Sequence, residues 1–584
     1  MKSIKSIFFA LLALVSFSAC SDHDDFDIPE ASDKPEVKVE GPDYLVMLYA
    51  VGGGNLDAAI MSNIYQALDV GSSDNVKMTV QFKLSSKEQK LYPQFDGTRR
   101  LDLDDNMQLV GTMKEAVADY PIISNSYQVF AKLFSQLKSE SIANSLYDMA
   151  KSDALADFIS WSMKKHPNAK RTILIISGHG SGWQLARDGK QDSRANKQIS
   201  RAILQDDNTK ALMSLGSVVE GVKKSAGKVD LLYDDACLMS MYENLYGYAD
   251  CANYLLAAVE QTPGAGGDYS KLINDLKKTG TSYAGLEATM HNFADYLVSD
   301  KWWTSGKLIG LGYGGKYHDI ALYDLSKLPI LTAVLNKVAD TMAKKFTSDE
   351  SVEPTVKGVT LGEHFSGYIN YAFTNCQIAY VNDFYSLDYI PESLCPYVEA
   401  DQLEEYPYVA NSVYLSSLVD WMKYGESENA RNAHESFPEE WAWLQRVIIT
   451  QSVPSFSLTD ILRILDNKLT EVGARNNPFK QLRAEMLAAL KEVGHISCTI
   501  GDEKPGIDQA YELCSPGITI VPFNDAYYDK VSNTFLKDIP TYQEALGIYQ
   551  QTDFDRQVGW NRVLQHIGIF PDLFSNPARN RVGK

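Results

Sequence analysis

The chain has 584 residues, of which 45% are hydrophobic and 22% charged, and its formal net charge is −20 at pH 7. This length exceeds one ordinary domain, so we expect two or more. The composition is that of a globular protein, and the acidity argues against a broad nucleic-acid-binding surface, which needs clustered positive charge. A negative net charge is compatible with binding basic peptides, but in most proteins it only keeps the protein soluble. The net charge alone therefore identifies no binding partner.

The N-terminus is typical of a processing signal. A positively charged start leads into an apolar run over residues 7–17, which is too short to span a membrane in the mature protein. Ser18-Ala19-Cys20 then resembles the cleavage site of bacterial lipoproteins, with Cys20 as the lipidated residue. Phe17 stands where such sites usually have Leu, and the alternative is an ordinary secretory signal cut nearby. Either interpretation gives a signal peptide over residues 1–19 and a mature protein outside the cytoplasm.

The segment after Cys20 is acidic and then rich in Pro, Asp, Glu and Lys, so we expect an unfolded tether over residues 20–42. Some surface-exposed lipoproteins of Gram-negative bacteria carry a similar acidic run after the lipidated cysteine. We therefore expect a lipid-anchored protein of the cell envelope, in the outer membrane and displayed at the cell surface. The lipid is the expected membrane contact, because no later segment has the length and apolarity of a transmembrane helix.

From residue 44 the chain alternates between apolar strands and amphipathic helices. Strands are expected at 44–51, 76–82, 172–177, 229–233 and 254–260. Helices are expected at 56–69, from a cap at Asp153, at 215–224 and at 327–345. This alternation predicts an α/β fold, a doubly wound and mostly parallel sheet flanked by helices, over residues 43–345.

Beyond about residue 346 the pattern changes. Residues 366–415 are rich in Tyr and lack long periodic runs, whereas helices are expected near 457–471 and 478–493. Short strands are expected near 495–500 and 517–522. We predict a mixed α+β C-terminal domain or elaboration over residues 346–584. A tyrosine-rich surface can bind peptides or glycans, although Tyr is also common in mixed cores.

The chain has seven cysteines, six of them beyond Cys20, in a compartment that is expected to be oxidising. Pairing of Cys498 with Cys514 and of Cys376 with Cys395 is compatible with the sequence, which cannot fix the connectivity. No pair has Cys-x-x-Cys spacing, which argues against a zinc ribbon or a thioredoxin-like site.

Two of the predicted strands end in residues that can do chemistry. The strand 172–177 leads into Gly178-His179-Gly180, and the apolar run 229–233 leads through Asp234-Asp235 into Ala236-Cys237. If these strands are near neighbours in one parallel sheet, a base and a thiol nucleophile meet at its carboxyl edge. A helical pattern follows the cysteine, and a helix N-terminus stabilises a thiolate. The alternative is a structural thiol and a turn histidine.

Motifs of other hydrolases are missing. His434-Glu435 does not begin a His-Glu-x-x-His zinc motif, and the chain has no Gly-x-Ser-x-Gly. Residues 310–315 match Gly-x-Gly-x-x-Gly, but a strand-like segment follows them instead of a helix, so we interpret the match as coincidental.

The motifs around His179 and Cys237 together resemble the clostripain family of cysteine endopeptidases, which belongs to the caspase-like clan. The resemblance rests on residues 176–183, on Asp235-Ala236-Cys237-Leu238-Met239 and Glu243, and on the blocks 254–260, Pro263-Gly264 and Asp268-Tyr269. Asn55-Leu56 and residues 320–326 are similar to further blocks of the family. It covers residues 44–340 well and the C-terminal part only in patches. The family implies a caspase-like α/β fold and a Cys-His dyad.

By this resemblance Cys237 is the nucleophile and His179 is the general acid that protonates the leaving amine. The backbone amides of Gly180 and Cys237 would form the oxyanion hole. The chemistry agrees with these roles, because each donor aimed at a tetrahedral oxygen is typically worth about 2.7–4 kcal/mol. The expected partner is therefore a protein or peptide substrate.

The family cleaves after Arg or Lys, and the acid at the base of its specificity pocket corresponds to Asp235. A buried carboxylate facing a guanidinium is a sound selector, because an unpaired charge there is costly. The family turn Pro-Gly-Asp-Gly-Trp has Ala265 in place of its acid and Gly267 in place of its tryptophan here. We still expect cleavage after Arg or Lys. The specificity pocket would lack one carboxylate, at Ala265, and one wall, at Gly267.

Family members are often matured by a cut between the His and Cys strands, and the basic loop 187–201 suits such a cut. Some also need calcium, but Asp206 and Asp207 fit a solvated turn, so no metal ligand is assigned. The alternative function is a catalytically weak or inactive surface lipoprotein that binds peptide or glycan. The presence of both His179 and Cys237 favours the peptidase.

Overall fold

The computed structural model describes residues 41–566 with gaps, of which the longest are 85–94, 111–135, 184–203, 304–316, 353–363 and 374–454. Several expectations lie outside these described residues. They concern the signal peptide, lipidation at Cys20, most of the tether, the basic loop 187–201, the tyrosine-rich segment and the pair Cys376 and Cys395.

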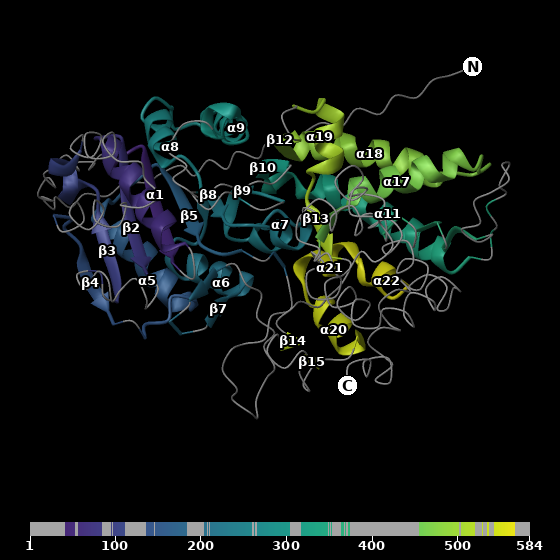
Figure 1. The fold of residues 1–584 in the computed structure, drawn as a ribbon, viewed down its shortest axis with the longest axis horizontal. Coiled ribbons are helices and arrows are strands. Elements are labelled where there is room, and N and C mark those ends of the chain that lie inside the picture. The colour runs from purple at the N-terminus through teal and green to yellow at the C-terminus, as the bar shows by residue number, and fades with distance from the viewer. Residues whose placement is uncertain are drawn as a thin grey trace, which may run out of the picture. The chain divides into compact units, whose positions relative to one another are not determined.

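A nine-stranded mixed sheet forms the centre of the fold, in the order β12-β10-β9-β8-β5-β1-β2-β3-β4 (Figure 1). Its strands are β1 (Tyr44–Val51), β2 (Val76–Lys83), β3 (Thr98–Asp102), β4 (Glu140–Ala143), β5 (Arg171–Ser177), β8 (Val229–Asp235), β9 (Ala252–Ala257), β10 (Tyr317–Asp324) and β12 (Gly494–Ile500). The strands from β9 through β8, β5 and β1 to β2 are parallel, and the strands outside them pair antiparallel. The predicted α/β class is confirmed.

Helices cover both faces of the sheet. One face packs on α1 (Asp57–Val70), α8 (Tyr269–Leu276) and α9 (Tyr283–Leu297), and the other on α5 (Ser152–Lys165), α6 (Leu215–Ser225), α7 (Tyr242–Tyr248) and α11 (Leu328–Phe346). All eight residues of β1 are buried, and alternate residues belong to the two separate cores. Burial on both faces explains why the central strands are continuous apolar runs.

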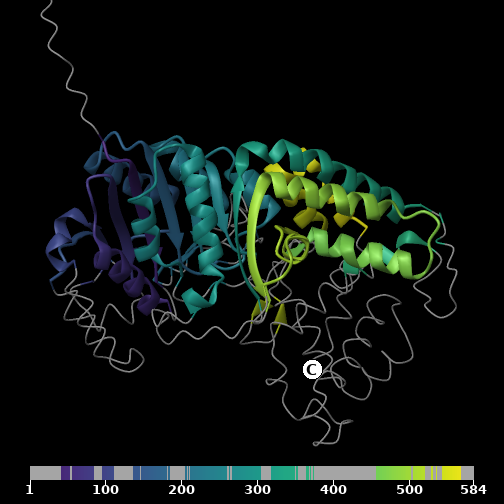
Figure 2. The same ribbon diagram turned by 90° about the horizontal axis from the view of Figure 1, so that it is seen from above.

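The chain beyond α11 returns to the same sheet. The helices α17 (Leu458–Glu471) and α18 (Pro478–Val493) pack together, α18 contacts α11, and α18 leads directly into β12, which pairs with β10 (Figure 2). The contacts group residues 41–584 as one unit. A domain boundary near residue 345 stays a prediction, but the sheet itself is built from both sides of it.

The remaining elements are short. They are β6 (Leu204–Asp206), β7 (Ala211–Met213), α10 (Asp300–Trp303), β11 (Ser455–Ser457), α19 (Ile507–Leu513), β13 (Gly517–Thr519), β14 (Tyr528–Asp529), β15 (Thr534–Phe535), α20 (Tyr542–Tyr549), α21 (Asp553–Val558), α22 (Asn561–Leu564) and two 3-10 turns at Asp104–Leu109 and Leu325–Lys327. β11 pairs with β13, β6 with β7 and β14 with β15. None of the described helices is both long and apolar enough to cross a membrane.

Four expectations about local structure are wrong. Asp206 does not lie in a solvated turn, because it is fully buried and its Oδ2 lies 2.6 Å from Lys83 Nζ. Lys151, not Asp153, occupies the N-cap of α5, and it forms no side-chain cap. Cys498 and Cys514 are both thiols and form no disulfide. The helix expected to follow Cys237 directly begins only at Tyr242, because Leu238 has a left-handed φ of 64° that a continuous helix cannot accommodate.

Candidate active site

The strands that carry the predicted dyad are direct neighbours. β5 and β8 pair in parallel with Ser177 opposite Asp235, so the two chains leave the same edge of the sheet side by side. We call residues 178–183 the histidine turn and residues 236–241 the nucleophile turn. The His179 side chain is exposed, and the Cys237 side chain is partly buried.

Glycines allow the two turns to touch. A Cβ atom at Gly180 would lie 2.2 Å from the carbonyl oxygen of Cys237 and 2.9 Å from its amide nitrogen. A Cβ atom at Gly182 would lie 2.8 Å from the carbonyl oxygen of Leu238. These distances exclude any other residue without backbone movement, and Gly182 also has a positive φ of 66°. The structure therefore brings the backbone around Gly180 and Cys237 together, as the sequence predicts.

The thiol of Cys237 contacts Thr262. Its Sγ lies 3.9 Å from the carbonyl oxygen of Thr262 and 3.7 Å from the hydroxyl Oγ1. Burial raises the pKa of Cys237, while the two Thr262 contacts act in the opposite direction. Because α7 starts five residues further on, its N-terminus does not provide the thiolate stabilisation that we expected. This arrangement favours a protonated thiol.

Asp235 is a buried carboxylate with three neutral donors. Its Oδ2 accepts hydrogen bonds from the Tyr269 hydroxyl at 2.7 Å and the Gly267 amide at 3.1 Å, and its Oδ1 accepts one from the Tyr233 hydroxyl at 3.2 Å. Burial raises the pKa of Asp235, and these donors oppose the rise. Among the described residues no cation pairs with it.

The turn that departs from the family pattern lies directly against this carboxylate. Gly266 has a φ of 63°, and a Cβ atom there would come within 2.3 Å of Asp235 Oδ2. A Cβ atom at Gly267 would lie 2.8 Å from the Tyr233 hydroxyl. The backbone of residues 266–267 therefore covers Asp235, whose role as a pocket floor stays a prediction.

The comparisons with known proteins agree with these motifs. The model of the clostripain family matches residues 105–430, which is more than half of the chain and includes both His179 and Cys237. The chain belongs to the clostripain family. Because members of this family are cysteine peptidases, the chain is assigned as a cysteine peptidase. No curated protein matches it.

Several solved structures are similar to this clostripain-family chain. A secreted C11 cysteine protease from Bacteroides thetaiotaomicron is 14% identical over 52% of this chain and 71% of its own, with a TM-score of 0.33. The same kind of protease from that organism, in complex with an irreversible peptide inhibitor, is 13% identical over 54% and 74%, with a TM-score of 0.33. An inactive zymogen C11 protease from Parabacteroides distasonis is 15% identical over 57% and 78%, with a TM-score of 0.34. The family assignment rests on the family match and not on these likenesses.

Sequence reasoning missed several residues of this clostripain-family site. Tyr233 lies two positions before Asp235 on β8, and the alternation of a strand could have placed its hydroxyl on the same face. Thr262 comes from another segment and gave no local signal. Tyr269 belongs to a block of the family resemblance, but nothing in the sequence indicated its contact with Asp235. Asp234 is fully buried on the opposite face, and neither of its oxygens has a hydrogen-bond partner among the described residues.

The described residues contain one cluster of metal-type ligands, Asp102, Asp104 and His166. Its members are already paired, since His166 Nε2 lies 2.9 Å from Asp102 Oδ2 and Lys77 Nζ lies 2.8 Å from Asp104 Oδ2. Calcium prefers six to eight oxygen ligands, so a set with a histidine and a lysine beside it does not fit calcium. We derive no catalytic step from a metal.

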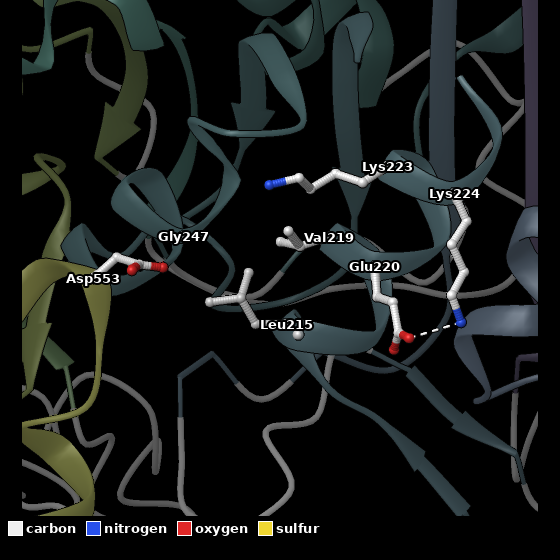
Figure 3. Close-up of a pocket in the computed structure, with 8 residues that line it drawn as sticks. Leu215, Val219, Glu220, Lys223, Lys224, Gly247 and Asp553 are labelled. Carbon is white, nitrogen blue, oxygen red and sulfur yellow. Dashed lines mark ion pairs between the residues drawn. The ribbon is translucent and has the colours of Figure 1, made fainter. Parts of the chain in front are cut away.

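A surface groove of 480 Å³ lies elsewhere, between α6, the end of α7 and α21 (Figure 3). Its cations are paired, with Lys224 Nζ 2.7 Å from Glu220 Oε1 and Lys223 Nζ 3.1 Å from Asp250 Oδ2. None of the predicted site residues lines this groove.

Proposed function

We propose that the protein is a cysteine endopeptidase that uses Cys237 as nucleophile and His179 as general acid and base. The observation that carries this proposal is the close contact of the Gly180 backbone with the amide and carbonyl of Cys237. It lets one substrate carbonyl reach both turns.

In the proposed reaction His179 accepts the thiol proton, and Cys237 Sγ attacks the scissile carbonyl carbon. The resulting oxyanion accepts hydrogen bonds from the amides of Gly180 and Cys237. His179 then returns the proton to the leaving amine as the C–N bond breaks, which leaves a thioester. Water, deprotonated by His179, attacks the thioester and releases the acid and the thiol.

We propose a preference for Arg or Lys before the cut. The support for this preference is that the three groups that donate hydrogen bonds to the Asp235 carboxylate are all neutral, so none of them balances its negative charge. A guanidinium or ammonium would provide the missing positive charge, and an apolar side chain would not. The backbone of residues 266–267 must shift for a substrate to reach the carboxylate, because Gly266 lies against it.

The test is cleavage of a fluorogenic Arg or Lys peptide by the wild type, Cys237→Ala and Cys251→Ala. Cys251 is a buried thiol on the same strand–helix unit, so its variant controls for the loss of a cysteine. We expect cleavage by the wild type and by Cys251→Ala only. Cleavage that persists in Cys237→Ala, or a folded wild type that cleaves no peptide, would contradict the proposal.

The second candidate is an inactive peptide- or glycan-binding protein. Two observations favour it, namely the raised pKa of the Cys237 thiol and the backbone that covers Asp235. A folded wild type that binds peptide without cleaving it would support this candidate.

We also propose that Cys20 carries the lipid that anchors the chain to the cell envelope, with the peptidase at the cell surface. Metabolic labelling with palmitate should mark the wild type and not Cys20→Ser. Equal labelling of both would contradict the anchor.

A further inference from the structure

The nucleophile turn is held by residues from the far end of the chain. Immediately after it, Glu243 in α7 is fully buried, and its Oε1 accepts hydrogen bonds from the Thr519 amide at 3.1 Å and the Tyr549 hydroxyl at 2.6 Å. Thr519 ends β13 and Tyr549 ends α20. In Figure 1, α7 lies beside β13, and the two are in contact.

A second set of bonds holds the backbone of the turn itself. The carbonyl oxygen of Ser240 accepts a hydrogen bond from the Gly517 amide at 2.8 Å, and Met241 pairs with Gly517 in a parallel bridge. The amide of Ser240 donates to the carbonyl oxygen of Ala258 at 2.7 Å, and its hydroxyl lies 2.8 Å from that of Tyr323. The segment after Cys237 is therefore fixed on one side by β10 and by Ala258, the residue after β9, and on the other side by β13.

The conformation of the turn explains why it needs such support. Leu238, directly after the nucleophile, has a φ of 64°, which is costly for a residue with a branched side chain. Such a conformation persists only where the surroundings over-determine it. The bonds from Gly517, Thr519 and Tyr549 provide that constraint.

Tyr549 also contacts the histidine turn, through Trp183. Its ring meets the ring of Trp183 edge to face, with the centroids 5.0 Å apart. Trp183 ends the histidine turn, and its amide donates to Met241 Sδ at 2.8 Å. One side chain from the C-terminal part thus joins the turn that carries His179 to the helix that follows Cys237.

We propose that Tyr549 and Glu243 are positioning residues through which the C-terminal part of the chain holds the two catalytic turns at their working separation. This inference rests on the proposed function for its kinetic readout only. The C-terminal part is then a component of the active site and not an independent binding module.

The test compares Tyr549→Phe with Tyr511→Phe in the full chain. The control is matched, since Tyr511 is also buried and also lies in the C-terminal part. Its hydroxyl donates to the Gly494 carbonyl oxygen at 2.7 Å, and not to a described residue of either turn. We expect Tyr549→Phe to lower kcat for the Arg peptide between about tenfold and about a hundredfold, the cost of a small misplacement, with KM little changed. Tyr511→Phe should keep the wild-type kcat.

Alkylation of Cys237 by iodoacetamide gives a readout that does not require peptidase activity. A loosened turn exposes the thiol, so Tyr549→Phe should be alkylated faster than the wild type by about threefold or more at neutral pH. A lower kcat together with faster alkylation separates mispositioning from general loss of fold. Equal behaviour of the two Phe variants in both assays would overturn the inference, even if the wild type cleaves peptide.

Glu243 provides a second test if Tyr549→Phe does not fold. Glu243→Gln keeps the Oε1 acceptor for Thr519 and Tyr549, whereas Glu243→Leu removes it. The inference predicts that Glu243→Leu lowers kcat and speeds alkylation as Tyr549→Phe does, whereas Glu243→Gln has a kcat at least about tenfold higher than Glu243→Leu and an alkylation rate close to that of the wild type. Identical values for Glu243→Leu and the wild type would overturn it. A folded wild type that is inactive but alkylates with the predicted pattern would instead refute only the proposed function.

Discussion

Replacing Asp234 with Asn should stabilise the protein at neutral pH and not in acid. Asp234 is fully buried, and its two oxygens have no hydrogen-bond partner among the described residues. Burial raises its pKa from 3.8 to about 7, and the nearby Tyr248 hydroxyl only partly opposes this. The folded state therefore favours the protonated acid, while the unfolded chain ionises it near its ordinary pKa.

The sign and size of the effect follow from that difference. Because the folded pKa is the higher one, the contribution of Asp234 to stability is fully present below about pH 4 and is lost as the pH rises through about 7. At about 1.4 kcal/mol per pH unit, the loss approaches about 4 kcal/mol at pH 8. A neutral Asn has no such dependence, although its amide would also lack partners, which lowers stability equally at every pH.

The assay is urea unfolding of both proteins at pH 4.5, 6 and 8, in a Cys237→Ala background that prevents self-cleavage. The difference in free energy of unfolding between Asn and Asp should grow in favour of Asn as the pH rises. Asp250→Asn is the control, because Asp250 is exposed and its ion pair with Lys223 is worth little. A difference between Asp234→Asn and the wild type that is constant with pH would refute the reasoning.

Three further predictions concern the site. Thr262→Val removes the hydroxyl 3.7 Å from Cys237 Sγ and should raise the thiol pKa further, seen as a shift of the iodoacetamide pH profile to higher pH; an unchanged profile would refute it. Gly266→Ala should abolish Arg-peptide cleavage, because its Cβ would collide with the carboxylate of Asp235. Gly227→Ala, with a similar φ of 71° and nothing within 4 Å of its Cβ, should only lower stability, by about 1–2 kcal/mol. Equal activity of these two variants would count against it. Asp235→Asn should reduce kcat/KM for Arg peptides by about a hundredfold relative to Leu peptides. Because burial raises the pKa of Asp235, the wild-type Arg preference should also weaken as the pH falls, and a pH-independent preference would contradict this.

The sequence is informative where local patterns decide the structure. The apolar run of β1 and the helix α18 have the predicted bounds, the latter because Asn477 caps it and Pro478 occupies its first turn. The positions of His179 and Cys237 at neighbouring strand ends also follow from local runs and the rules of parallel sheets.

Contacts between distant segments could not be predicted in the same way. β12 begins 170 positions after the end of β10, beside which it joins the sheet, and its apolar pattern does not indicate which strand it pairs with. The contacts of Thr262 with Cys237 and of Tyr549 with Glu243 depend on the assembled fold. The helical spacing after Cys237 predicts the wrong start for α7, because the positive φ of Leu238 delays the helix to Tyr242. Leucine rarely has a positive φ, so the residue type gives no sign of this conformation.

The measurement that tests the central claim most directly is peptide mapping after treatment with an irreversible inhibitor built on an Arg peptide. The four cysteines of the described residues are all thiols, so each is a candidate site of reaction. We predict a single adduct on Cys237 that disappears in His179→Ala. An adduct on Cys251, Cys498 or Cys514, or none on Cys237 of a folded wild type, would contradict the account.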